Sequence, residues 1–263
     1  MTDDTDQLRS EEKRKKQYFE LVENKKYKEA EQVWHRLHRG TYIGDLVFGA
    51  NDGIITTFAV VSGAAGALLS PGVIIILGLA NLIADGFSMG ASNFLSLRSE
   101  RDFVKLQRKK EEWEVKHFPE IEREEVRDIL RHWGVPREHV EPATNAITRD
   151  EKRWIDLMMR EELDLKEEGP GSPAQHGFAT FLAFVVAGFF PLIPYLLPQV
   201  PNQFLVSGVV AGCAFFGVGA ARSLVTATAP LKAGLEMLLV GGFAAAVAFG
   251  IGFAVKTLFG IVV

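Results

Sequence analysis

The sequence predicts an all-α membrane protein with five transmembrane helices and a small cytoplasmic helical metal-binding domain inserted between the second and third spans. The first observation is the placement of charge: all but three of the 29 Lys and Arg residues lie within 1–40 and 97–176. The second is a set of apolar segments, each long enough to cross about 30 Å of hydrocarbon as a helix. These segments are about 43–67, 73–96, 178–197, 203–225 and 233–259.

The charge pattern also predicts how the chain is divided and oriented. The expected parts are a cytoplasmic amphipathic helix within 1–40, the first two spans in 41–97, the metal-binding domain in 98–170 and the last three spans in 171–263. The amphipathic helix is expected over about 11–38. If the spans alternate in direction, every basic flank falls on one side, which the positive-inside rule makes cytoplasmic. The N-terminus is then cytoplasmic and the C-terminus lies on the opposite side.

Composition removes several classes of protein. A single cysteine, Cys213, excludes an intrachain disulfide framework. No Walker motif is present, so ATP is not the expected source of energy. The net charge of −4 gives no reason to expect a nucleic-acid partner. Membrane lipid is the expected surrounding.

Two acidic residues stand out in the first span. Asp45 and Asp52 are seven residues apart, which is two helical turns, so both face the same way about 10 Å apart. A carboxylate near mid-bilayer costs roughly 2.5–3.5 kcal/mol. A sequence that keeps such residues indicates that a cation passes them. An aspartate can carry either a proton or a metal ion, which is the chemistry of antiport.

The second span has polar or soft side chains at every fourth position, namely Asn81, Asp85, Met89 and Asn93. This stripe and the acids of the first span together predict a path lined by carboxylates, amides and a thioether. Asp85 either lines the path or bonds a neighbouring helix. Met89 alone would be an ordinary core residue, and the two asparagines are more typical of interhelical hydrogen bonds.

The block between the second and third spans is expected to consist of helices that begin or end at Pro and Gly. One helix runs from about 73 to 117, and a second begins at Pro119 and ends at Gly134. A third begins at Pro136, and a fourth covers about 150–166. All six histidines lie outside the predicted spans, and no Cys/His zinc pattern is present.

Three spacings in this block place metal-binding side chains on common helix faces. Glu111 with Glu114 and Glu122 with Glu125 are three apart, and Met158 with Glu162 are four apart. Helices folded against each other would unite them as a cage of carboxylates and a thioether, which suits a transition metal. The alternative is that the glutamates are solvated surface charges and that Met158 and Met159 are core residues.

The runs 45–63, 80–90 and 154–163 resemble the vacuolar iron transporter family. The similarity covers about residues 40–260, and the N-terminal helix over 11–38 has no counterpart in the family's common core. The resemblance implies a homodimer of five-span subunits that exchanges Fe²⁺ for protons, with Mn²⁺ as a second substrate. It assigns Asp45, Asp52 and Met89 to the translocation path. It assigns the cytoplasmic metal-binding positions to Glu111, Glu114, Glu122, Glu125, Met158 and Glu162, with Met159 beside them.

The sequence and the resemblance together predict a proton-coupled exporter of cytosolic Fe²⁺ that is not an enzyme and has no permanently bound cofactor. Co²⁺, Ni²⁺ and Zn²⁺ are further candidates for the cytoplasmic site. The expected location is the plasma membrane of a prokaryote or the vacuolar membrane of a eukaryote. The alternatives are a transporter of another transition metal and a membrane-anchored iron-binding or ferroxidase protein. The block contains one Glu-x-x-His spacing, Glu114 with His117, and not the pair of motifs from two helices that is typical of diiron oxidases.

Overall fold

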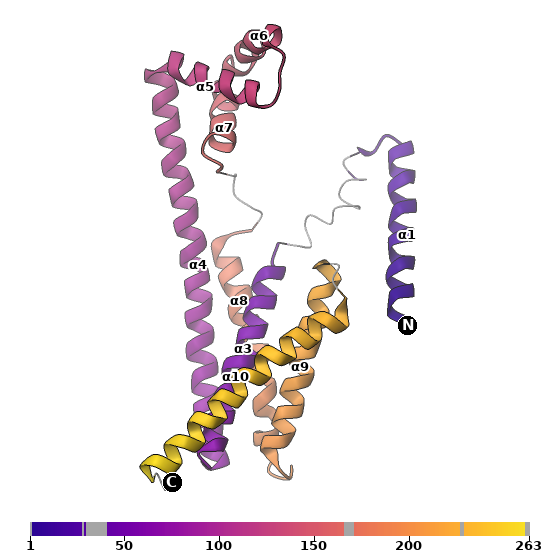
Figure 1. Ribbon diagram of the computed structural model, residues 1–263, viewed down its shortest axis with the longest axis vertical. Helices are drawn as coiled ribbons and strands as arrows, with labels where there is room; N and C mark the ends of the chain where they lie inside the picture. Colours follow the sequence, from indigo (N-terminus) through magenta and orange to yellow (C-terminus); the bar gives the residue numbers. More distant parts are fainter. Residues whose placement is uncertain (1, 28, 30–40, 166–170, 227–228, 261–263) are drawn as a thin grey trace. The chain divides into compact units, whose positions relative to one another are not determined.

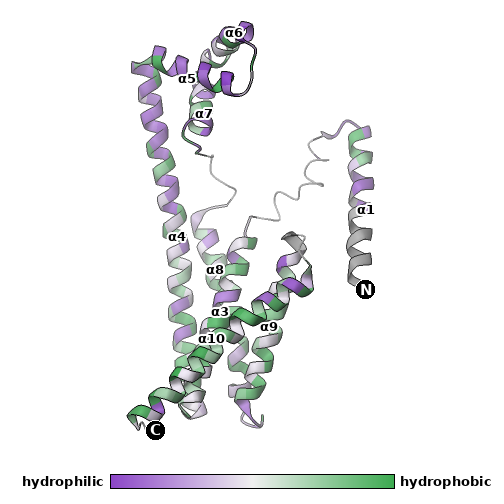
Figure 2. Cartoon of the chain, in the orientation of Figure 1, coloured by the Kyte–Doolittle hydropathy of each residue, from purple (hydrophilic) through white to green (hydrophobic). Residues whose placement is uncertain are grey.

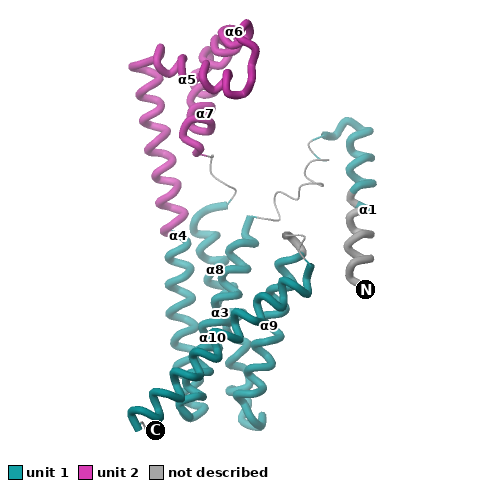
Figure 3. Tube along the Cα trace, viewed as in Figure 1, with its two compact units in different colours: residues 1–94, 170–263 teal, residues 95–169 magenta. Residues whose placement is uncertain are grey.

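A computed structural model describes residues 2–27, 29, 41–165, 171–226 and 229–260 of the chain. Within these residues every regular element is a helix (Figure 1). The chain divides into two compact units, one formed by 1–94 with 170–263 and the other by 95–169 (Figure 3). The division falls within the long helix α4, Pro71–His117.

Four helices are long and apolar enough to cross a membrane, and a bent pair supplies a fifth candidate. The four are α3 (Ile43–Gly66), α4, α9 (Gln203–Thr226) and α10 (Pro230–Phe259). The pair is α8 (Pro173–Gly188) and the 3₁₀ helix η1 (Phe190–Leu196), which meet at 41°. Figure 2 shows α10 as mostly hydrophobic and α5 to α7 as largely hydrophilic. The prediction of a multi-pass helical membrane protein is confirmed, with the third span bent.

The bend in the third span has a local cause. Pro191 and Pro194 both lie in η1, and proline has no backbone N–H with which to continue the α-helical hydrogen bonds. The chain therefore tightens into 3₁₀ geometry after Gly188. The apolar run predicted as a span over about 178–197 is therefore an α-helix followed by a 3₁₀ helix.

Glycines let the spans of the first unit approach closely around α3. A Cβ added at Gly53 would lie 2.3 Å from the carbonyl oxygen of Phe184 in α8. A Cβ added at Gly252 in α10 would lie only 1.9 Å from the carbonyl oxygen of Gly63. Between these contacts the core is filled by fully buried side chains such as Ile54. Small residues at helix crossings are the usual means by which membrane helices pack.

The second unit contains the end of α4 together with α5 (Pro119–His132), α6 (Arg137–Thr148) and α7 (Glu151–Glu161). The helix starts expected at Pro119 and Pro136 agree with the structure. Gly134 ends α5 with a φ of 77°, a left-handed conformation that glycine adopts without strain. The core of this unit is made by buried side chains, among them Val126, Trp154, Ile155, Met158 and Met159.

Two expected helix ends are wrong. The last helix of the block ends at Glu161 and not near 166, because the backbone turns at Asp164, where φ is 50°. The N-terminal helix α1 covers Thr2–Glu23 and is not continuous over 11–38. Lys25 has a φ of 57°, and Lys26 N–H donates to Leu21 O, the bonding of a Schellman cap. Residues 28 and 30–38 of that prediction lie outside the described residues.

The glycine contact between α3 and α10 gives a testable prediction. We expect Gly252→Ala to destabilise the chain by about 1–3 kcal/mol, the usual cost of overpacking a well-packed site. Gly250→Ala is the matched control in the same helix, since a Cβ there meets nothing within 4 Å. Helix propensity alone would make alanine neutral or stabilising at both positions. Thermal unfolding of the two variants in detergent measures this difference in stability. Equal midpoints would contradict the close contact between α3 and α10.

Candidate metal sites

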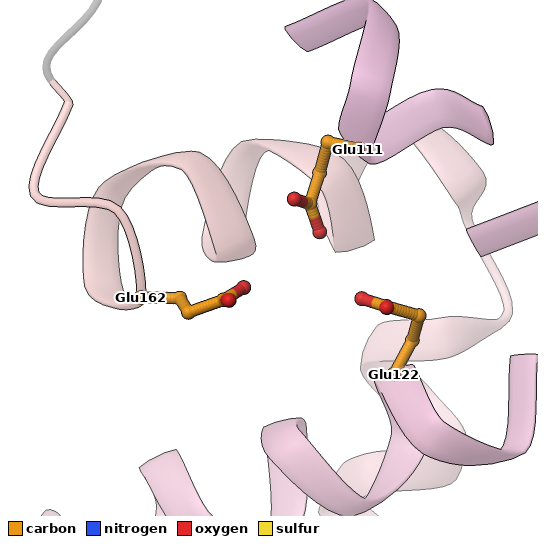
Figure 4. A group of neighbouring side chains, drawn as sticks. All are labelled: Glu111, Glu122 and Glu162. Carbon is orange, nitrogen blue, oxygen red and sulfur yellow. The ribbon is translucent and has the colours of Figure 1, made fainter. Parts of the chain in front are cut away.

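Three glutamates converge in the second unit. Glu111 lies in α4 and Glu122 lies in α5, and Glu162 is the C-terminal cap residue of α7. One carboxylate oxygen of each lies within 4.8 Å of the other two (Figure 4). We call these three residues the Glu cage. Each of them belongs to a different one of the three predicted spacings, and the fold brings the three together.

The turn at Phe118 explains how α4 and α5 present their acids to each other. Pro119 begins α5 immediately after α4 ends at His117, so the chain changes direction sharply at Phe118 (Figure 1). Glu162 follows α7 closely enough for its N–H to donate to Met158 O at 3.0 Å. Buried apolar side chains, Trp154 among them, hold α7 in this unit.

Two members of the cage are buried without enough polar partners, whereas the third, Glu162, is exposed. Glu111 is 2% exposed and Glu122 is 5% exposed. Their carboxyl groups are joined by a hydrogen bond. Yet Oε1 of Glu111 and Oε2 of Glu122 are buried with no hydrogen-bond partner among the described residues. A buried carboxylate that lacks partners is costly, and a bound cation would remove that cost.

The cage also shifts the pKa of its members. Burial, followed by repulsion from Glu125 and Glu111, raises the pKa of Glu122 to about 8. Burial, followed by repulsion from the same two residues, raises the pKa of Glu162 to about 7. The pKa of Glu111 is raised chiefly by burial. At neutral pH the cage therefore holds protons that a divalent cation would replace.

The other predicted ligands of this unit fall into two kinds, acids that act on the cage and buried methionines. Glu114 and Glu125 are half-buried and act on it electrostatically. Met158 is 0% exposed and Met159 is 4% exposed, and both belong to the hydrophobic core. Their packing agrees with the expectation that methionines there are core residues. Their role as ligands stays a prediction.

Within the spans, the structure separates the predicted path residues into two groups. The first surrounds Asp45, whose Oδ1 accepts a hydrogen bond from Asn93 Nδ2 at 2.7 Å. Its Oδ2 lies 2.5 Å from Nδ1 of His176. Asn93 also donates to Thr180 Oγ1 at 2.7 Å, so it makes the interhelical hydrogen bonds expected of it.

His176 is the residue that the sequence analysis missed. It was placed outside the third span, whereas α8 begins at Pro173 and includes it. Ser172 and Gln175 form a capping box that starts the helix there. The Ser-x-x-Gln spacing before an apolar run is the sequence signal that would have placed His176 in the first helical turn.

The second group contains Asp52 and Asp85, which interact electrostatically across α3 and α4. Both are half-buried. Met89 packs against the hydrophobic core one turn after Asp85. Two carboxylates on neighbouring apolar helices repel each other unless a proton or a cation lies between them. The spacing of Asp45 and Asp52 along one helix does not reveal this second partner.

These features define an integral membrane protein with acidic groups inside its spans and a partly buried cluster of carboxylates in a separate helical unit. Comparison with known proteins gives the particular family. The sequence profile of the VIT family matches residues 43–253, and the chain belongs to this family.

Three relatives illustrate the similarity. Vacuolar iron transporter 1 of Arabidopsis thaliana is 34% identical over 211 residues, which is 80% of this chain and 84% of the relative. Vacuolar iron transporter of Centaurea cyanus is 31% identical over 232 residues, which is 88% of this chain and 95% of the relative. Vacuolar iron transporter of Plasmodium falciparum is 33% identical over 247 residues, which covers 87% of this chain and 90% of the relative. The resemblance stated from the sequence motifs is confirmed.

The raised pKa values of the cage predict how stability depends on pH. Between the ordinary 4.5 and about 8, Glu122 keeps its proton when folded and loses it when unfolded. Stability without metal should therefore fall as pH rises through this window. Glu122→Gln removes the effect, so its unfolding midpoint should exceed that of the wild type by several degrees more at pH 8 than at pH 5. About 1 kcal/mol corresponds to roughly 4–8 °C in a unit of this size.

Tryptophan fluorescence of the full chain measures this transition, since three of its four tryptophans, Trp113, Trp133 and Trp154, lie in the second unit. Glu161→Gln is the control, because that side chain is exposed next to the cage residue Glu162. A difference between variant and wild type that is the same at both pH values would contradict the assigned environment of Glu122.

Proposed function

We propose that this chain exports Fe²⁺, with Mn²⁺ as a second substrate, from the cytosol in exchange for protons. The observation that carries the proposal is the Asp52–Asp85 pair on two apolar helices. Membership of the VIT family and the names of the relatives support iron as the cargo. Those relatives are named as transporters, which agrees with the expectation that the chain is not an enzyme.

The Glu cage is the proposed capture site. Carboxylate oxygens suit Fe²⁺ and Mn²⁺, and buried oxygens without partners favour a cation over water. We place the second unit on the cytoplasmic side, because it carries many of the basic residues and the positive-inside rule assigns such segments to the cytoplasm. The cage then raises the local concentration of the ion before transport. Glu114, Glu125, Met158 and Met159 are proposed as its further ligands.

Asp45, Asp52, Asp85 and Met89 are the proposed path. An ion that enters between Asp52 and Asp85 removes their mutual repulsion, and protons restore neutrality when it leaves. The cycle thus couples movement of the metal to movement of protons in the opposite direction. No hydrolysis of ATP is required.

A second copy of the chain is proposed to complete the pathway. The outer residues of α10, such as Leu239 and Phe243, are more than two-thirds exposed in a single copy. Such apolar surface faces either lipid or another subunit. The path residues Asp52 and Asp85 are only half-buried by one copy. A two-fold symmetric dimer would enclose them.

Neutralising the path is the first test. We expect Asp52→Asn to abolish Fe²⁺ uptake into proteoliposomes with an imposed pH gradient, because the amide neither carries a proton nor balances a divalent charge. Asp102→Asn is the matched control, since Asp102 is 65% exposed in the second unit. Normal transport by Asp52→Asn would place the path elsewhere. Loss of Fe²⁺ that consumes O₂ without accumulation in the vesicles would favour the ferroxidase alternative.

Weakening the cage should affect capture rather than passage. The double variant Glu111→Gln with Glu122→Gln should raise the Fe²⁺ concentration at half-maximal uptake by about tenfold or more, as loss of metal-site contacts usually does. Its maximal rate should stay near that of the wild type. The control is Glu100→Gln with Glu161→Gln, which neutralises two exposed glutamates of the same unit. Equal kinetics for the two double variants would refute capture by the cage.

A further inference from the structure

Three helices of the first unit bring different metal-binding atoms to one place. Asp45 in α3 supplies carboxylate oxygens. His176 in α8 supplies an imidazole, and Asn93 in α4 supplies an amide. The side chains of Asp45 and His176 are 13% and 15% exposed. Nδ1 of His176 lies 2.5 Å from Oδ2 of Asp45. The group therefore lies mostly shielded from solvent at one end of the spans.

The imidazole of His176 is held in a fixed orientation. Its ring lies against Tyr42, with the ring centroids 4.8 Å apart. On another side is Gly171, where an added Cβ would lie 2.9 Å from Nε2 of His176 and 2.7 Å from the hydroxyl of Tyr42. Gly171 has a φ of 99°, which favours glycine, so the close approach is built into the turn before α8. A side chain fixed in this way is preorganised for binding.

The distance within the Asp45–His176 pair is close to what a shared ion requires. Metal–nitrogen and metal–oxygen bonds of first-row ions are about 2.0–2.2 Å. Adjacent ligands of such an ion are then about 3 Å apart, so a small separation of the two side chains would admit it. Such an ion would replace the direct contact between the two side chains.

The remaining candidate positions offer a different chemistry. The Glu cage and the Asp52–Asp85 pair supply oxygen, and Met89 supplies a thioether. Among the described residues of the candidate sites, only His176 supplies imidazole nitrogen. Imidazole favours Fe²⁺, Ni²⁺ and Zn²⁺, whereas carboxylate and water are also well suited to Mn²⁺ and Mg²⁺.

We propose that His176 and Asp45 together form a metal site in which the imidazole nitrogen gives the path its preference for Fe²⁺ over Mn²⁺. This inference rests on the proposed transport function and adds a specificity-determining residue to it. Asn93 donates a hydrogen bond to the other carboxylate oxygen of Asp45 and so keeps this carboxylate oriented toward His176. Exchanging the nitrogen ligand for an amide should lower selectivity without removing the hydrogen bond that orients Asp45.

Pulsed electron paramagnetic resonance of Mn²⁺ bound to the full chain tests the ligand directly. The wild type should show coupling to an imidazole nitrogen, and His176→Asn should lose it. Asparagine places an amide N–H near the position of Nδ1, so the contact with Asp45 is kept. His132→Asn removes an exposed histidine of the second unit and should leave the coupling unchanged. The proposal is overturned if the wild type shows no such coupling or if His176→Asn retains it.

Competitive uptake of Fe²⁺ and Mn²⁺ into proteoliposomes tests the effect on selectivity. The ratio of Fe²⁺ to Mn²⁺ transported should fall about tenfold in His176→Asn while Mn²⁺ uptake continues. An unchanged ratio would mean that His176 only orients Asp45. His176→Gln replaces His176→Asn if the latter is not monodisperse after purification. Failure of the wild type to move either metal would contradict the proposed function, whereas the resonance experiment would still decide the nitrogen ligand.

Discussion

A carboxylate that is removed from water needs a proton, a hydrogen-bond donor or a cation, and this requirement governs both units of the chain. In the second unit it raises the pKa of Glu122 and Glu162 and leaves buried oxygens without partners. In the spans it applies to Asp52 and Asp85, two carboxylates on neighbouring helices that repel each other. Neither arrangement is favourable for folding, which is the reason for proposing both as binding sites.

The features of the sequence that rest on local chemistry were predictable. The apolar segments predicted the spans, and Pro119, Gly134 and Pro136 predicted helix boundaries because proline and glycine act on their own backbone. Helical spacing placed Glu111 and Glu122 on usable faces. Helical spacing did not predict the turn at Phe118, which helps to bring acids from separate helices into one cluster.

The errors arose where a few residues outweigh periodicity. The N-terminal helix ends at a Schellman cap on Lys25, although the apolar pattern continues beyond it. The third span bends because Pro191 and Pro194 interrupt an otherwise apolar run. His176 was set aside because the apolar segment begins after it, whereas the capping box starts the helix before it. Contacts between helices, such as Asp45 with His176, are set by the tertiary fold and leave no trace in spacing.

The two aspartates of α3 illustrate how one helix can offer two kinds of site. Asp45 has a partner on each oxygen, Asn93 on one and His176 on the other, so its geometry is fixed before any ion arrives. Asp52 is repelled by the carboxylate of Asp85, so a proton or a cation near the two groups would lower their energy. A fixed site selects among ions by the type and geometry of its ligands, whereas a repelling pair responds mainly to charge. Selection at Asp45 followed by charge exchange at Asp52 would separate the choice of metal from its coupling to protons.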